Sequence, residues 1–170
     1  MANMIPIQTV TVGSGGASSI DFNNIPQIYT DLIVKGSLRA TGAGAGNAYS
    51  VYLQLNGVTT NRTYRRLYGF GTTAGSDNGT QAVIGTAGGT GGTVSTFDNL
   101  EIYIPNYTSS NNKSFSVDSV AEDNSSAGNE LDLVAGLWSN TSAITSVGLT
   151  INGQTLAQYS SATLYGIRKY

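Results

Sequence analysis

Apolar and polar residues alternate through short segments along almost the whole sequence, and turn-forming residues separate one segment from the next. A period of two places one set of side chains on a buried face and the other in solvent, as in a half-buried β-strand. The cleanest alternating face consists of Tyr49, Val51, Leu53 and Leu55, and Asn56-Gly57 follows at once. Because Asn-Gly is a strong signal for a tight hairpin turn, this segment predicts a strand that ends in such a turn.

Segments of this kind recur with regular turn spacing, which is typical of β-sandwiches. We therefore expect an all-β chain that folds as a single antiparallel β-sandwich, jelly-roll-like, with about ten short strands. The expected strands lie near residues 5–10, 18–22, 32–39, 49–55, 64–70, 80–86, 97–104, 115–120, 131–138, 147–151 and 163–167. No segment has the periodicity of a helix.

The composition also disfavours helices. Gly, Ser, Thr and Asn make up nearly half of the chain, only 11% of the residues are charged, and glutamate occurs three times. Long helices need Ala, Leu, Glu, Lys and Arg on their faces. The ten tyrosines, the many β-branched residues and the net charge of −2 favour a folded chain over a disordered one. Since there is no cysteine, the core or an oligomer must supply the stability that disulfides give other small domains.

We expect one domain over residues 1–170, in which residues 1–17 form an N-terminal strand or arm. Residues 69–93 differ from the rest because they are rich in Gly and Thr and contain a single charged residue, Asp77. We predict a long loop there, with one weak strand around residues 80–86. Long loops in compact domains are usually functional or mobile.

Several classes of function are disfavoured by what the sequence lacks. A nearly neutral chain offers little to phosphate backbones, so we expect no nucleic-acid partner. No apolar stretch is long enough to span a bilayer, and residues 1–12 lack the basic and apolar regions of a signal peptide. With neither His nor Cys, the chain cannot form Ser-His or Cys-His nucleophile systems or a His/Cys metal site. We expect no cofactor.

The acidic residues leave two alternatives open. A glycoside hydrolase needs only two carboxylates in a cleft, but none of the ten acidic residues lies in a recognisable motif, so we favour a protein that is not an enzyme. Oxygen ligands for Ca²⁺ could come from Glu122, Asp123, Asn124, Glu130 and Asp132. Their spacing is not that of an EF-hand, and a solvated acidic loop is the simpler interpretation.

Two further features could belong to a binding surface. Arg62, Arg65 and Arg66 are close together, and as a basic edge they could dock on an acidic partner protein, since Arg is enriched at interfaces. Alternatively, Arg65 faces solvent while Arg62 and Arg66 share the other face of a strand. Trp138, the only tryptophan, is expected to anchor the core between the sheets. The alternative for Trp138 is a platform on which sugars stack.

Four stretches together resemble a family of small virion proteins of tailed bacteriophages. Residues 19–32 read SIDFNNIPQIYTDL, residues 104–107 read IPNY, residues 136–146 read GLWSNTSAITS, and residues 159–167 read YSSATLYGI. The resemblance covers most of the chain, from about residue 18 to residue 167, and leaves out residues 69–93. It implies a virion component, on the capsid surface or at a tail or fibre.

The function we expect is therefore that of a non-enzymatic structural protein at the virion surface. A capsid decoration or cement protein would bind assembled shell proteins and copies of itself, and we expect a symmetric oligomer, specifically a trimer. The alternative is a receptor-binding module of a tail or fibre that recognises host cell-surface glycan. In that case residues 69–93 and tyrosine-rich strand ends would form the site.

Overall fold

A computed structural model describes residues 3–43, 48–122, 124 and 129–168. Within these residues the chain forms twelve β-strands and no helix, and hence no helix that could cross a bilayer. The strands are β1 (Asn3–Thr11), β2 (Ser19–Phe22), β3 (Asp31–Leu38), β4 (Ala48–Leu55), β5 (Arg62–Phe70), β6 (Thr73–Gly79), β7 (Val83–Gly88), β8 (Asp98–Ile104), β9 (Lys113–Ala121), β10 (Glu130–Trp138), β11 (Val147–Ile151) and β12 (Ser161–Arg168). The prediction of an all-β fold is confirmed, with twelve strands in place of about ten.

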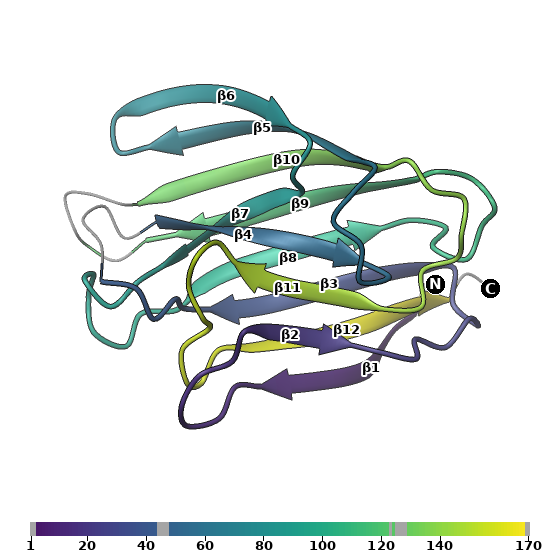
Figure 1. The fold of residues 1–170 in the computed structure, drawn as a ribbon, viewed down its shortest axis with the longest axis horizontal. Coiled ribbons are helices and arrows are strands. Elements are labelled where there is room, and N and C mark those ends of the chain that lie inside the picture. Colours follow the sequence, from purple (N-terminus) through teal and green to yellow (C-terminus); the bar gives the residue numbers. More distant parts are fainter. Residues whose placement is uncertain (1–2, 44–47, 123, 125–128, 169–170) are drawn as a thin grey trace.

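The strands form two antiparallel sheets that pack against each other (Figure 1). The large sheet has the order β1-β12-β3-β8-β9-β10-β5-β6, and the small sheet has the order β2-β11-β4-β7. Each neighbouring pair of strands is antiparallel. This is the antiparallel β-sandwich that the sequence predicts.

Eight of the strands follow the path of a jelly roll. The chain passes back and forth between the sheets, so that β1-β12-β3-β8 lies opposite β2-β11-β4-β7. Two interleaved four-stranded sheets of this order are the arrangement of a jelly roll. The other four strands, β9, β10, β5 and β6, continue the large sheet beyond β8, and this part is called the sheet extension below.

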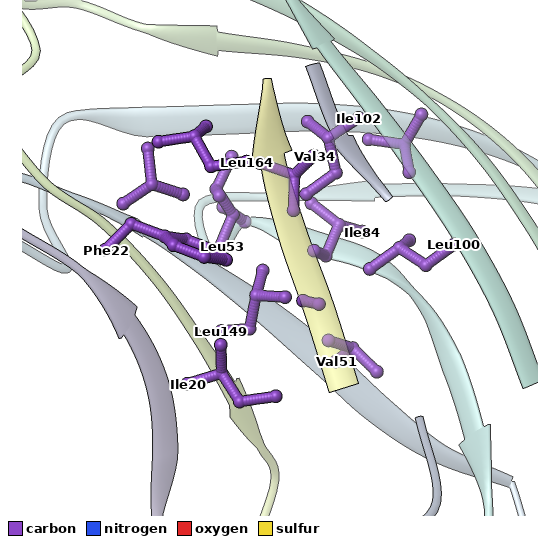
Figure 2. Close-up of a cluster of buried hydrophobic side chains, with 14 of the residues drawn as sticks. Ile20, Phe22, Val34, Val51, Leu53, Ile84, Leu100, Ile102, Leu149 and Leu164 are labelled. Atoms are coloured by element: carbon purple, nitrogen blue, oxygen red, sulfur yellow. The ribbon is translucent and has the colours of Figure 1, made fainter. Parts of the chain in front are cut away.

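The core lies between the two sheets and is made by the buried half of each alternating strand. Figure 2 shows side chains from both sheets gathered in one cluster, among them Phe22 and Leu53 from the small sheet and Val34 and Ile102 from the large sheet. None of these four side chains reaches solvent. Period-two alternation therefore produced a continuous apolar layer, as expected for a sandwich.

The Asn56-Gly57 signal forms a tight turn, although not the expected hairpin between consecutive strands. Both residues have positive φ, 53° and 69°, as a type I′ turn requires. The strand before the turn, however, pairs with β7 and β11 rather than with β5, because the chain crosses to the other sheet after the turn. Local turn chemistry was predictable here, whereas the pairing partner depends on the whole topology.

The prediction of a long loop over residues 69–93 is wrong, because β6 and β7 both lie in this segment. The glycines of β6 have a packing role: a Cβ at Gly75 would meet the ring of Tyr68, and a Cβ at Gly79 would meet the ring of Tyr64. The strand expected around residues 80–86 corresponds to β7. It is buried on both sides along most of its length and so shows no alternation.

Candidate interaction surface

The sheet extension gives the molecule a region that the jelly roll itself does not have. The edge strand of the small sheet, β7, packs over β9 and β10. Strands β5 and β6 continue beyond that edge (Figure 1). The extension therefore has an inner face that is partly covered by the small sheet and an outer face that points away from it.

The inner face carries an ion-pair cluster centred on Arg66. Its guanidinium donates hydrogen bonds to Asp77 at 2.7 and 3.1 Å, to Glu130 at 2.9 Å and to Asp132 at 3.1 Å. Strand pairing brings the cluster together, since β5 lies between β6, which carries Asp77, and β10, which carries the other two acids. Three carboxylates on one guanidinium leave this cluster with an excess of negative charge.

Burial makes that excess charge costly for Asp132. This residue is 1% exposed. Burial raises the pKa of Asp132 to about 7, with a further contribution from the neighbouring Glu130, and the attraction of Arg66 only partly opposes the rise. Burial raises the pKa of Glu130 as well. The buried Oδ2 of Asp132 and the buried Oγ of its cross-strand neighbour Ser119 have no hydrogen-bond partner within the described parts of the chain.

The raised pKa predicts that Asp132 makes stability depend on pH. A carboxyl whose pKa is higher in the folded than in the unfolded state stabilises fully below its unfolded pKa, and this contribution is lost as pH rises toward its folded pKa. The wild type is expected to lose stability as pH rises from 4 to 8, whereas Asp132→Asn has no carboxyl to ionise at this position. The unfolding free energy of Asp132→Asn relative to that of the wild type is therefore expected to increase by about 2 to 4 kcal/mol over this range. Urea unfolding at a series of pH values measures this difference, and parallel profiles for the two proteins would contradict it.

The three arginines singled out in the sequence have different environments. Arg62 is buried and donates hydrogen bonds to the carbonyls of Leu53 and Thr59, and Arg66 is held by the ion-pair cluster. Arg65 is exposed on the opposite face of β5. The expected division, with Arg65 in solvent and the other two on one face, is confirmed, so Arg65 is the arginine of this group that a partner can reach.

Trp138 belongs to the core, as predicted. It is 1% exposed, and its cross-strand neighbours are the buried Arg62 on β5 and the buried Lys113 on β9. Its indole Nε1 finds no hydrogen-bond partner among the residues described. A sugar-stacking platform requires an accessible ring face, so the alternative role for Trp138 is excluded.

The Ca²⁺ site considered in the sequence analysis loses two of its five candidate ligands. Glu130 and Asp132 are buried and point to Arg66, as described above. Glu122 accepts a hydrogen bond from the backbone N–H of Asn124 at 2.8 Å, and Asp123 lies outside the described residues. In the described part of the chain, no group of three or more acidic side chains is placed to hold a metal ion.

The outer face of the extension is apolar and open to solvent. Leu67 of β5 and Leu131, Leu133 and Leu137 of β10 are 61%, 56%, 59% and 37% exposed. They form one surface, because Leu67 and Leu133 are direct cross-strand neighbours and Ala135 continues the row along β10. We call these four leucines the leucine face. Grooves along this surface are lined by Leu67, Leu131 and Leu133.

The sequence contains a signal for the leucine face that the strand prediction did not use. Residues 131–138 read LDLVAGLW, which puts apolar side chains on both sides of the strand. An alternating strand with one face exposed to solvent would carry polar residues on that face. Val134 and Trp138 face the core, while the leucines face solvent, so this strand carries apolar residues on both sides.

No protein-family model matches the sequence, and no curated protein matches it.

Proposed function

We propose that this chain is a non-enzymatic structural protein at the surface of a tailed-bacteriophage virion, specifically a capsid decoration protein. It binds the assembled shell proteins and copies of itself. The motifs at residues 19–32, 104–107, 136–146 and 159–167 support the virion setting by resemblance. The jelly roll fits this setting because viral capsid proteins are among its common users, although a fold alone does not define a function.

The observation that carries the proposal is the leucine face. Soluble monomers rarely expose contiguous apolar patches of large area, and such patches mark sites of protein interaction. Four leucines on two hydrogen-bonded strands form a rigid patch that needs no rearrangement to bind. The chain also has a net charge of only −2, which gives weak protection against association. These features suit a protein that works inside an assembly.

Such a protein reinforces a particle by mass action. If it binds the assembled shell but not free subunits, each site stabilises the assembled state by RT ln(1 + c/Kd), where c is the concentration of the free protein. This role requires a scaffold and a binding surface, which the sandwich and the leucine face would supply, and it requires no catalytic group.

The alternative of a glycan-binding module is less well supported. Its site was expected in a long loop at residues 69–93, but this segment forms β6 and β7. The rings of Tyr64 and Tyr68 lie across the glycines of β6 rather than standing open for a sugar. A glycan array probed with the full chain tests this alternative directly.

Copy number per particle tests the proposed function. Quantitative mass spectrometry of purified virions is expected to find the chain at a number comparable to that of the main shell protein. A handful of copies would contradict the decoration role and point to a tail or fibre. Absence from the particles would remove the virion proposal altogether.

A leucine-face variant tests the surface. Leu133→Ser is expected to weaken binding to particles that lack the protein by at least about tenfold, because burying one leucine contributes roughly 1.5–3 kcal/mol. The matched control is Ile28→Ser, since Ile28 is also about 60% exposed but lies in the loop between β2 and β3. Equal binding by both variants would show that the leucine face has no role on the particle, neither in contact with the shell nor in contact with another copy of the chain.

A further inference from the structure

We infer that the leucine face is covered by a second copy of this chain, docked face to face about a twofold axis that runs along β10. This inference rests on the proposed function in treating the leucine face as an assembly surface. It goes further by naming the occupant and the symmetry.

The arrangement of residues around the leucines provides the first support. On the outer face, β10 lies between β5 and β9. Strand pairing places Arg65, Ala135 and Ser116 in one row, and Leu67, Leu133 and Asp118 in the next row. The apolar residues of β10 therefore form a central strip, with a cation on one flank and an anion on the other, one row apart.

Neither flanking charge has a partner among the described residues of its own chain. Arg65 and Asp118 are exposed, and neither forms an ion pair or a side-chain hydrogen bond with any described residue. Glu101 is the cross-strand neighbour of Asp118 on β8, and it is already paired with Lys35 at 2.7 Å. The surface thus holds one free positive and one free negative group on opposite sides of an apolar strip.

A twofold rotation about an axis along β10 makes this pattern complementary to itself. The rotation lays the leucines of one β10 on those of the other and places each β5 over the β9 of the second copy. Each Arg65 then faces the segment that carries Ser116 and Asp118. Sheets that pack face to face lie about 10 Å apart, a gap that arginine and aspartate side chains can span together.

The pattern fits a second copy better than a ring of three. In a twofold interface both subunits use the same patch, whereas a threefold ring joins two different patches. The leucine face carries both charges on a single patch, as a twofold interface requires. The trimer expected from the sequence would leave this internal complementarity unused.

The oligomeric state of the full chain tests the inference. Sedimentation equilibrium over a range of concentrations is expected to show a monomer–dimer equilibrium. Leu133→Ser is expected to raise the dimer dissociation constant by about a hundredfold, because each dimer loses two buried leucines. The control Ile28→Ser is expected to dimerise as the wild type does. A monomer at all concentrations, or a trimer, would overturn the inference.

A charge exchange tests the axis itself. Arg65→Asp and Asp118→Arg are each expected to raise the dissociation constant by roughly tenfold, because each variant places two pairs of like charges across the interface. The double variant should recover to within about threefold of the wild type, since its charges are again opposite. Losses that add up in the double variant would overturn the proposed axis. Circular dichroism checks that each variant is folded.

The outcomes separate this inference from the proposed function. A chain that is monomeric in solution but binds particles through the leucine face would overturn the dimer and leave the decoration role intact, with the shell as the occupant. A dimer with the expected charge behaviour that is absent from virions would support the inference and remove the virion role.

Discussion

Arg66→Met is expected to lower the free energy of unfolding by about 3–5 kcal/mol near neutral pH. The reason is that the substitution removes the only cation from a cluster in which Glu130 and Asp132 are almost completely buried. Removing one partner of a buried ion pair leaves the charges of the other partners uncompensated in a medium of low polarity. Urea unfolding followed by circular dichroism measures the loss.

The matched control for this prediction is Lys35→Met. Its ion pair with Glu101 has a similar length, 2.7 Å, but both side chains are nearly half exposed. Solvent screens an exposed pair of this kind, so this control is expected to change stability little. The loss in Arg66→Met should shrink as pH falls below about 7, because burial raises the pKa of Asp132 to about 7 and its protonation removes one of the charges that Arg66 compensates. Equal effects of the two substitutions would show that the Arg66 cluster is effectively solvated.

The main sheets could be predicted from the sequence because their strands obey period-two alternation. Strand β9 is the clearest example, with buried and exposed residues alternating along its whole length. The same logic placed Arg65 on one side of β5 and Arg62 and Arg66 on the other. Side-chain direction within a strand is a local property, and local properties follow from the sequence.

The strand that was missed, β6, and the strand that was predicted only as a weak one, β7, lack this local signal. Strand β7 is buried on both sides, and β6 consists mainly of small residues that have little preference for a strand. Long-range pairing holds both in place: β6 pairs with β5, and β7 pairs with β4. A glycine-rich composition predicts a loop when it is considered alone, and the tyrosine rings that lie across the glycines come from another strand.

The sequence indicates that both sides of β10 are apolar, but it does not indicate which side forms the candidate interaction surface. Leucines on one side of β10 and Val134 and Trp138 on the other indicate that both sides meet apolar surroundings. Which side is covered within the chain depends on where the small sheet ends, and it ends at β7. The Arg66 cluster was hidden for a similar reason, since Arg66 and its partner Glu130 are 64 residues apart.

Trp138→Ala is expected to destabilise the fold by about 3–5 kcal/mol, the usual effect of removing a large buried aromatic side chain. Trp138 is among the largest fully buried side chains of the described chain and belongs to the single core cluster. Trp138→Phe provides the matched comparison. It keeps most of the apolar contact and removes an indole N–H that has no described partner, so it is expected to cost less than half as much.

Urea unfolding followed by far-ultraviolet circular dichroism measures both variants, since neither retains a tryptophan for fluorescence. An alanine variant as stable as the wild type would contradict the role of Trp138 in the core and reopen its role in binding a ligand. A large loss in the alanine variant with a small loss in the phenylalanine variant would instead place the whole of this side chain in the scaffold. Binding would then depend on the outer side of the same strand, where the leucines are.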